Sequence, residues 1–195
     1  MKWLHHLQRD GLLALVRAII GAQPSFRAPL PAPCVIFSNH TSHLDTLVLL
    51  AALPTAQRNR TQPVAAADYW NANAIRRHVA RNVLDVVFVD RAAGGPAALM
   101  PLAHALDAGS SLIVFPEGTR RQERLPGAFK SGLFHLTTAR PTLALVPAYL
   151  ENMNRVMPKG APVPLPLLCR VRFGTPMFND AGEDKDDFLA RAHAA

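Results

Sequence analysis

A histidine and an aspartate that could share a proton lie five residues apart in the segment 39–45, which reads NHTSHLD. On one regular helix His40 and Asp45 would point about 140° apart, so they would not share a helical face. If His40 lies in a loop and Asp45 in the first turn of the next helix, the carboxylate can accept a hydrogen bond from one imidazole nitrogen. That bond fixes the tautomer and makes the other nitrogen a better base. The pair could then deprotonate a hydroxyl group.

Three other interpretations of this segment stay open from the residues alone. Thr41 or Ser42 suits the N-cap of the helix, which would make the proximity of His40 and Asp45 structural. Ser42 could be the nucleophile of an esterase with a histidine base, although no GxSxG turn surrounds it. His40, His43 and Asp45 could bind a metal, but they lack the spacing of HExxH and no second cluster offers further ligands. We therefore expect no metal site.

Two more apolar runs end in charged residues. The segment 115–120, FPEGTR, places Glu117 and Arg120 after an apolar run, and the glycine between them permits a close approach of the backbone. The segment 88–91, FVDR, ends at Arg91, whose guanidinium can hold a phosphate through paired hydrogen bonds. Either segment taken alone is also typical of a solvated turn.

Apolar runs that alternate with amphipathic segments must position these residues. Strands are predicted at 34–38, 64–67, 86–89, 112–115, 143–150 and 168–173, and helices at 2–22, 42–53, 71–82, 95–109, 128–139 and from 183 onward. This alternation predicts an α/β fold with a mostly parallel or mixed central sheet flanked by helices. We expect an N-terminal amphipathic helix over 1–23, followed by a single domain over 24–195 that opens with a proline-rich connector at 24–33.

The carboxyl ends of parallel strands lie along one edge of a sheet. Charged residues at three predicted strand ends are therefore expected to meet in one cleft. These residues are His40, Asp45, Arg91, Glu117 and Arg120. A cleft that combines a base with arginines suits a phosphate-bearing substrate.

The first helix and the net charge bear on possible partners. One face of the predicted helix is apolar and carries Leu12, Leu13, Leu15, Val16, Ile19 and Ile20. Such a face suits either an anchor in the plane of a membrane or docking on the protein's own sheet. The formal net charge of +7 predicts attraction to an anionic partner, such as anionic lipid, an acidic carrier protein or nucleic acid. Nucleic acid is not expected, because the basic residues are not interleaved with aromatic ones.

Length and composition limit the domain number and the location. A chain of 195 residues with 49% hydrophobic residues is sufficient for one domain with a sizeable core. No run reaches the ~18 apolar residues of a spanning helix, and Arg17 interrupts the only N-terminal apolar region, so no signal peptide is expected. Cys34 and Cys169 lie in apolar contexts, so we expect buried thiols in a reducing compartment. These features predict a cytoplasmic protein with no spanning helix.

Taken together, the motifs resemble those of the glycerolipid acyltransferases with the HxxxxD motif, the family that includes 1-acylglycerol-3-phosphate acyltransferase. The resemblance covers residues 34 to 178, with all blocks in order. The matching blocks are NHTSHLD at 39–45, FVDR at 88–91, FPEGTR at 115–120, FKSG at 129–132, VPA at 146–148 and FGTP at 173–176. Arg121 departs from the pattern, because these enzymes often have serine there.

The resemblance implies a membrane-associated O-acyltransferase on the cytoplasmic face of the membrane. The hydroxyl of a lysophospholipid, such as 1-acylglycerol-3-phosphate, would attack the thioester of acyl-CoA or acyl-carrier protein, with no further cofactor. His40 would be the general base and Asp45 its orienting partner. The residues implied at the acceptor site are Arg91, Glu117, Gly118, Thr119 and Arg120. The competing hypothesis is a non-catalytic basic module that binds anionic membrane or nucleic acid.

Overall fold

The computed structural model describes residues 2–70, 73–90, 94–121, 123, 125–157 and 164–195. The strands within these residues are β1 (Gln23–Phe26), β2 (Cys34–Ser38), β3 (Thr61–Ala66), β4 (Val87–Val89), β5 (Ser111–Val114), β6 (Ala144–Glu151) and β7 (Arg170–Phe173). They form one sheet in the order β1-β7-β6-β2-β5-β3-β4. Neighbouring strands are parallel except β6 and β7, which are antiparallel. The predicted α/β fold with a mostly parallel or mixed sheet is confirmed.

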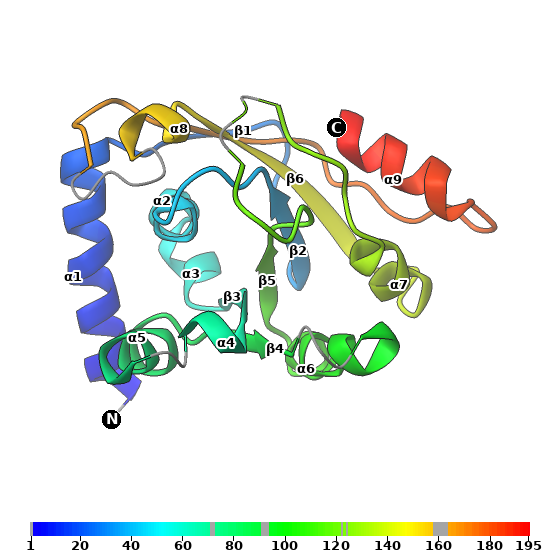
Figure 1. The fold of residues 1–195 in the computed structure, drawn as a ribbon, viewed down its shortest axis with the longest axis horizontal. Coiled ribbons are helices and arrows are strands. Elements are labelled where there is room, and N and C mark those ends of the chain that lie inside the picture. The colour runs from blue at the N-terminus through cyan, green and yellow to red at the C-terminus, as the bar shows by residue number, and fades with distance from the viewer. Residues whose placement is uncertain (1, 71–72, 91–93, 122, 124, 158–163) are drawn as a thin grey trace.

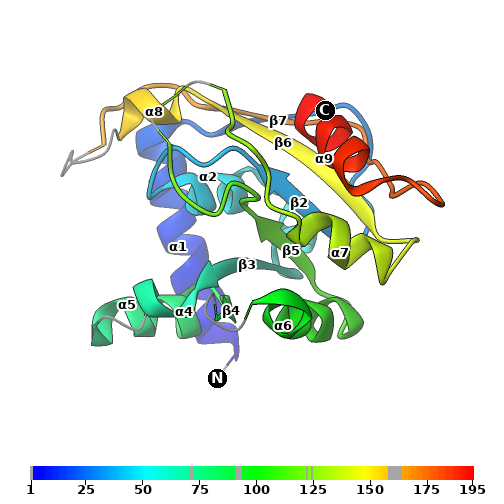
Figure 2. The ribbon, with the colours of Figure 1, turned by 45° about the vertical axis from the view of Figure 1, so that its right-hand side comes forward.

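Helices cover both faces of this sheet (Figures 1 and 2). They are α1 (Lys2–Ile20), α2 (Asp45–Ala52), α3 (Thr55–Arg58), α4 (Ala67–Trp70), α5 (Ala74–His78), α6 (Gly95–Asp107), α7 (Gly132–Thr138), α8 (Met153–Val156) and α9 (Lys185–Ala194), with a π-helical turn, η1 (Val79–Val83), continuing α5. One core cluster holds residues of α1, α2, η1 and α8, and a second holds residues of α6, α7 and α9. The sheet therefore lies between two apolar layers.

The strand β2 lies at the centre, between β5 and β6, and all of its residues are buried. Ile36 packs in the cluster of α1 and α2, whereas Val35 and Phe37 pack in the cluster of α6, α7 and α9. A strand covered on both faces has a continuous apolar sequence. This burial explains why the run at 34–37 predicts a strand, and it fixes the point from which the NHTSHLD loop leaves the sheet.

Long-range contacts overturn two predictions about local structure. The segment predicted as a proline-rich connector begins with β1, which pairs with β7; Pro24 fits there because an edge strand has no neighbour on its outer side. The helix predicted from residue 128 begins at Gly132 instead. The N–H of Lys130 donates to the carbonyl of Pro116, which holds the preceding residues against the end of β5.

The helix α1 buries only part of its apolar face. Leu13, Val16 and Ile20 lie in the core, while Leu15 is 57% exposed and Ile19 is 39% exposed. The helix packs against α2 and η1. The packing of α1 on the rest of the protein therefore buries one apolar stripe, whereas Leu15 and Ile19 form a second stripe at the surface. Among the helices of the described residues, none combines the length and the apolar character that crossing a bilayer requires.

Candidate active site

The loop between β2 and α2 brings His40 and Asp45 together. Nδ1 of His40 lies 2.8 Å from Oδ2 of Asp45, whose side chain is fully buried. The same oxygen accepts hydrogen bonds from the main-chain N–H groups of Thr41 (2.7 Å) and Ser42 (2.8 Å). Because a carboxylate only accepts hydrogen bonds, Nδ1 of the neutral ring donates and Nε2 is left as the basic nitrogen. The pair can therefore take up a proton at Nε2.

The hydrogen bonds of the Ser42 hydroxyl lie around the turn that leads into α2, so its role here is structural. The helix begins at Asp45 with no side-chain hydrogen bond at its N-cap, Leu44. The hydroxyl of Ser42 donates to the carbonyl of Met157 at 3.3 Å and accepts from the N–H of Leu44 at 3.3 Å. In this geometry the proton of Ser42 is not offered to a histidine. Within the described residues, no group of three or more His, Cys, Asp or Glu side chains could hold a metal ion.

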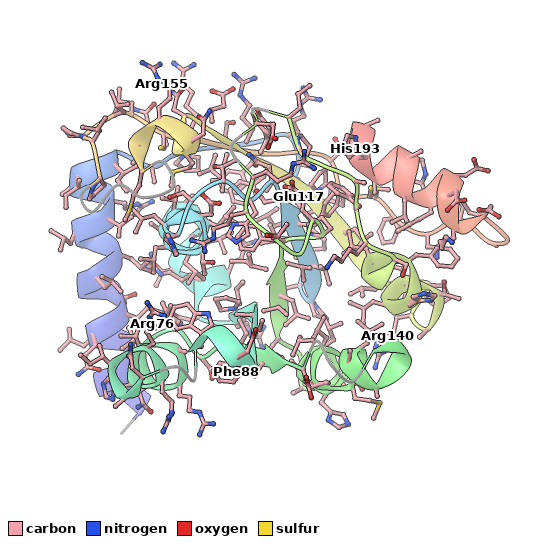
Figure 3. All side chains as sticks on the ribbon, viewed as in Figure 1. Arg76, Phe88, Glu117, Arg140, Arg155 and His193 are labelled. Carbon is pink, nitrogen blue, oxygen red and sulfur yellow. The ribbon has the colours of Figure 1, made fainter. Side chains whose placement is uncertain are left out.

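The segment FPEGTR follows β5 and holds His40 in place through hydrogen bonds and a ring contact. Glu117 is only 5% exposed, and its Oε1 accepts the main-chain N–H of His40 at 2.9 Å. Its Oε2 accepts the N–H of Gly127 at 2.8 Å, and the N–H of Arg121 donates to the carbonyl of His40 at 2.8 Å. The imidazole stacks on the ring of Phe115, with 4.1 Å between centroids and 16° between planes. Figure 3 shows Glu117 near the middle of the molecule.

Asn39 fastens the same loop to β6. Its side-chain amide donates to the carbonyl of Leu150 at 3.2 Å, and its side-chain oxygen accepts the N–H of Leu150 at 2.8 Å. The amide group thus replaces a main-chain partner where the pairing of β2 with β6 ends. This role was missed by the sequence prediction. An asparagine directly after a buried strand is the one local signal that could have indicated it.

Lys130 is a second residue that the sequence prediction did not assign. Its side chain passes across Gly118, so that a Cβ at Gly118 would lie 2.7 Å from the Lys130 ammonium nitrogen. Gly118 also has a φ of +69°, in the left-handed region that favours glycine. The turn therefore favours glycine at this position of FPEGTR, and a larger residue there would also displace the end of the Lys130 side chain.

A cavity of about 810 Å³ opens beside these groups. One part of its lining is polar or charged and contains His40, His43, Asp68, Arg76, Gly118, Thr119, Arg120 and Lys130. Another part is apolar and comes from β3, β4 and β5 and from α6 and α7: Val64, Val89, Leu99, Leu102, Val114, Leu133 and Leu136. Such a cavity can hold a ligand with a long apolar chain and an anionic group.

The predicted site residues take three kinds of position. His40, Gly118, Thr119 and Arg120 line the cavity. Asp45 and Glu117 are buried and hold His40 by its ring and by its backbone, respectively. Arg91 lies outside the described residues.

His43 lines the same cavity as His40. Burial lowers the pKa of its imidazole, and the positive charges of Arg120, His40 and Arg76 lower this pKa further, while the charge of Asp45 opposes them. His43 therefore favours the neutral form in a setting made positive by its neighbours.

Known proteins resemble this chain both in sequence and in fold. The sequence model of a family described as Acyltransferase matches residues 24–151. The 1-acyl-sn-glycerol-3-phosphate acyltransferase alpha of Mus musculus is 30% identical over 169 residues, which cover 84% of this chain and 56% of the relative. The protein of the same name from Homo sapiens is 32% identical over 128 residues, 64% of this chain and 42% of the relative. The chain thus spans about half the length of these relatives.

A solved structure shares the fold. The crystal structure of the 1-acyl-sn-glycerophosphate acyltransferase PlsC from Thermotoga maritima matches with a TM-score of 0.69, covering 95% of this chain and 77% of that chain. The sequence identity is 17%. At this identity the match supports the arrangement of the sheet and helices.

Proposed function

The chain belongs to the acyltransferase family whose sequence model matches residues 24–151, and from this premise we propose that it is a glycerolipid O-acyltransferase. It moves a fatty acyl group from an acyl thioester to the hydroxyl of a lysophospholipid such as 1-acylglycerol-3-phosphate. One observation carries the proposal. The Nδ1 of His40 is bound to a buried carboxylate oxygen at 2.8 Å, which leaves Nε2 to accept a proton at the wall of a cavity that is partly apolar and partly basic.

The reaction is a direct transfer with general-base catalysis. Nε2 of His40 accepts the proton of the acceptor hydroxyl while the hydroxyl oxygen attacks the thioester carbon. The negative charge of Asp45 stabilises the imidazolium that forms. The tetrahedral intermediate then expels the thiolate with cleavage of the C–S bond, and the imidazolium returns its proton to the thiolate sulfur. The products are an ester and a free thiol, and no group is left on the protein.

The two parts of the cavity suit the two ends of the substrates. Leu99 and Leu102 of α6, with Leu133 and Leu136 of α7, offer an apolar wall for a fatty acyl chain. Arg120 and Lys130 offer positive charge near His40 for a phosphate on the acceptor. Acyl-CoA and acyl-carrier protein are the two candidate donors, and neither requires a further cofactor.

The surface of α1 supports a place at the membrane. Leu7, Leu15 and Ile19 are 63%, 57% and 39% exposed on this helix. An exposed apolar stripe on a chain of net charge +7 is typical of a helix that lies in the plane of an anionic membrane surface. We propose that the protein lies on the cytoplasmic face of the membrane, where a lysophospholipid acceptor would be within its reach.

An assay of acyl transfer with matched histidine variants tests this function. Wild-type protein is given a panel of lysophospholipids with acyl-CoA and with acyl-carrier protein as donors. His40→Ala is expected to lower kcat by about 10²-fold or more, while the thermal unfolding temperature stays near that of the wild type. His104→Ala, at an exposed position of α6, is the control and should keep its turnover. Near-normal turnover by a folded His40→Ala variant, or no transfer by the wild type with any pair of substrates, contradicts the proposal.

A further inference from the structure

The short helix α5 contributes one wall of the cavity and lies outside the sequence blocks that resemble the family. Asn73 caps this helix, because its side-chain oxygen accepts the main-chain N–H of Arg76 at 2.9 Å. Ile75 and Arg76 both line the cavity, and Ile75 is 78% exposed. The cavity is therefore open to the surface at α5. Arg76 is labelled at this helix in Figure 3.

Positive charge gathers around His43, at the side of the cavity that α5 faces. The charges that act on the His43 imidazole come from Arg76 of α5, from Arg120 of the loop after β5, and from His40 and Asp45, which lie before and at the start of α2. Lys130 and Asp68 also line the cavity. Among the described residues of the lining, three are permanent cations and Asp68 is the one carboxylate, while Asp45 is fully buried and does not line the cavity. An anionic group is the ligand that such a lining attracts.

We propose that Arg76 and His43 bind the phosphate of the acceptor together with Arg120, and that they make acyl transfer selective for phosphate-bearing acceptors over uncharged ones. This inference rests on the proposed acyltransferase function. Arg76 can hold two phosphate oxygens through parallel N–H donors, and the neutral His43 can donate a hydrogen bond or accept a proton from the bound group. Burial is the largest cause of the lowered His43 pKa, and a phosphate placed among these residues would oppose the smaller effect of the neighbouring positive charges.

The position of the cluster assigns it to the acceptor rather than to the donor. In 1-acylglycerol-3-phosphate the free hydroxyl and the phosphate are on neighbouring carbon atoms. An acceptor whose hydroxyl meets Nε2 of His40 therefore has its phosphate close to that histidine, and His43 is near enough to His40 for their charges to interact. In acyl-CoA the whole pantetheine arm separates the reacting thioester from the phosphates. A phosphate beside the base thus belongs to the acceptor.

Arg76→Gln and Arg77→Gln form a matched pair for the test. The two arginines are adjacent on α5, but Arg77 is not among the described residues that line the cavity. Each variant, together with His43→Gln, is assayed with 1-acylglycerol-3-phosphate and with an uncharged monoacylglycerol, both presented in micelles of a neutral detergent. Equilibrium binding of 1-acylglycerol-3-phosphate is measured in parallel without a donor, so that affinity is known independently of turnover.

The expected result is a change in acceptor selectivity. Arg76→Gln should lower kcat/KM for 1-acylglycerol-3-phosphate by about 10- to 100-fold, which is the effect of one lost charge-assisted hydrogen bond to a phosphate. The loss should appear in KM and in Kd, with kcat largely kept. His43→Gln should shift selectivity in the same direction by a smaller factor. Transfer to monoacylglycerol and the KM for the donor should stay within about 3-fold of the wild type in both variants, and Arg77→Gln should match the wild type throughout.

Three outcomes overturn the proposal or the function on which it rests. An increase in the donor KM of Arg76→Gln, with the acceptor KM unchanged, assigns the arginine to the donor. Equal effects of Arg76→Gln and Arg77→Gln show a general surface charge effect and also overturn the proposal. If the wild type transfers no acyl group, the acyltransferase function fails, and a Kd that is equal in wild type and Arg76→Gln then removes the phosphate site as well.

Discussion

His40 is fixed at its ring and at its backbone by different residues. The ring is bound to Asp45 and stacks on Phe115, while the main-chain N–H and carbonyl are bound to Glu117 and to the N–H of Arg121. In the proposed reaction, a base that is already oriented would lose little freedom when the substrate arrives, which would lower the entropic part of the barrier. The two loops that carry the site therefore act as one unit.

Glu117→Gln tests this connection. Both carboxylate oxygens of Glu117 accept main-chain N–H groups, from His40 and from Gly127. An amide has one oxygen, so its NH₂ group would face a main-chain N–H, and one buried donor would lose its partner. We expect the free energy of unfolding to fall by about 1–3 kcal/mol and kcat to fall because the loop of His40 is less firmly held. Urea unfolding followed by circular dichroism and the transfer assay measure the two effects.

The control for this variant is Glu123→Gln in the same loop. Glu123 is 61% exposed, and its bond to Arg121 is a surface ion pair. Such pairs contribute little, so the free energy of unfolding should change by less than about 0.5 kcal/mol. If Glu117→Gln is no more destabilising than Glu123→Gln, the buried carboxylate does not join the loops in the way described.

Residue types and spacing predict the centre of this site but not its support. His40 and Asp45 could be paired from sequence because a loop followed by the first turn of a helix can bring a histidine and an aspartate five residues apart into contact. Asn39 could not be paired with Leu150, which is 111 residues away and is contacted through main-chain atoms that any residue would offer. Arg76 could not be assigned for the same reason, since only the fold brings α5 to the cavity.

At the scale of elements, apolar runs predict buried strands better than edge strands. β2 and β6 are covered on both faces, and their continuous apolar sequences are unambiguous. All four residues of β1 are exposed, and its sequence, QPSF, has no strand signal. Its pairing with β7, near the other end of the chain, decides its structure. The sequence likewise does not predict that β7 runs antiparallel to β6, because the apolar pattern of one strand does not specify the direction of its neighbour.

The exposed stripe of α1 leads to a prediction about membrane binding. Leu15→Gln combined with Ile19→Gln removes two exposed apolar side chains while leaving Leu13, Val16 and Ile20 in the core. If the stripe enters the membrane interface, the double variant should bind vesicles that contain anionic lipid about 10-fold or more weakly. Sedimentation with sucrose-loaded vesicles measures the bound fraction, and thermal unfolding should be unchanged.

Met100→Gln is the matched control for this experiment. Met100 is 52% exposed and lies on α6, which covers the sheet with the other helix layer. Its substitution removes one exposed apolar side chain from a different face of the molecule. Vesicle binding that falls equally in Met100→Gln and in the double variant would show that α1 has no special part in it.

For the molecule as a whole, both cysteines are buried, as their apolar contexts predict. Cys169 lies in the same core cluster as Met153, with its sulfur 3.2 Å from the Met153 sulfur. Burial raises the pKa of the Cys169 thiol to about 12, and the negative charge of Asp45 adds to this effect. The site carboxylate and the core thiol therefore influence each other through the interior of the protein.

This raised pKa makes the stability of the whole molecule depend on alkaline pH. The thiol ionises near 9.0 in the unfolded chain and near about 12 in the folded protein, so the folded state retains a proton that the unfolded state loses in this range. The contribution to stability is fully present below pH 9 and is lost as the pH rises toward 12, at about 1.4 kcal/mol for each pH unit. Cys169→Ala leaves a small cavity, whose cost does not depend on pH, and it removes this slope. The difference in unfolding free energy between wild type and variant, measured in urea from pH 7 to 10.5, should therefore be constant up to about pH 9 and then shrink. Lysine and tyrosine titrations occur in both proteins and cancel in the difference, so a difference that stays constant over the whole range would show that the Cys169 thiol is not held protonated by the fold.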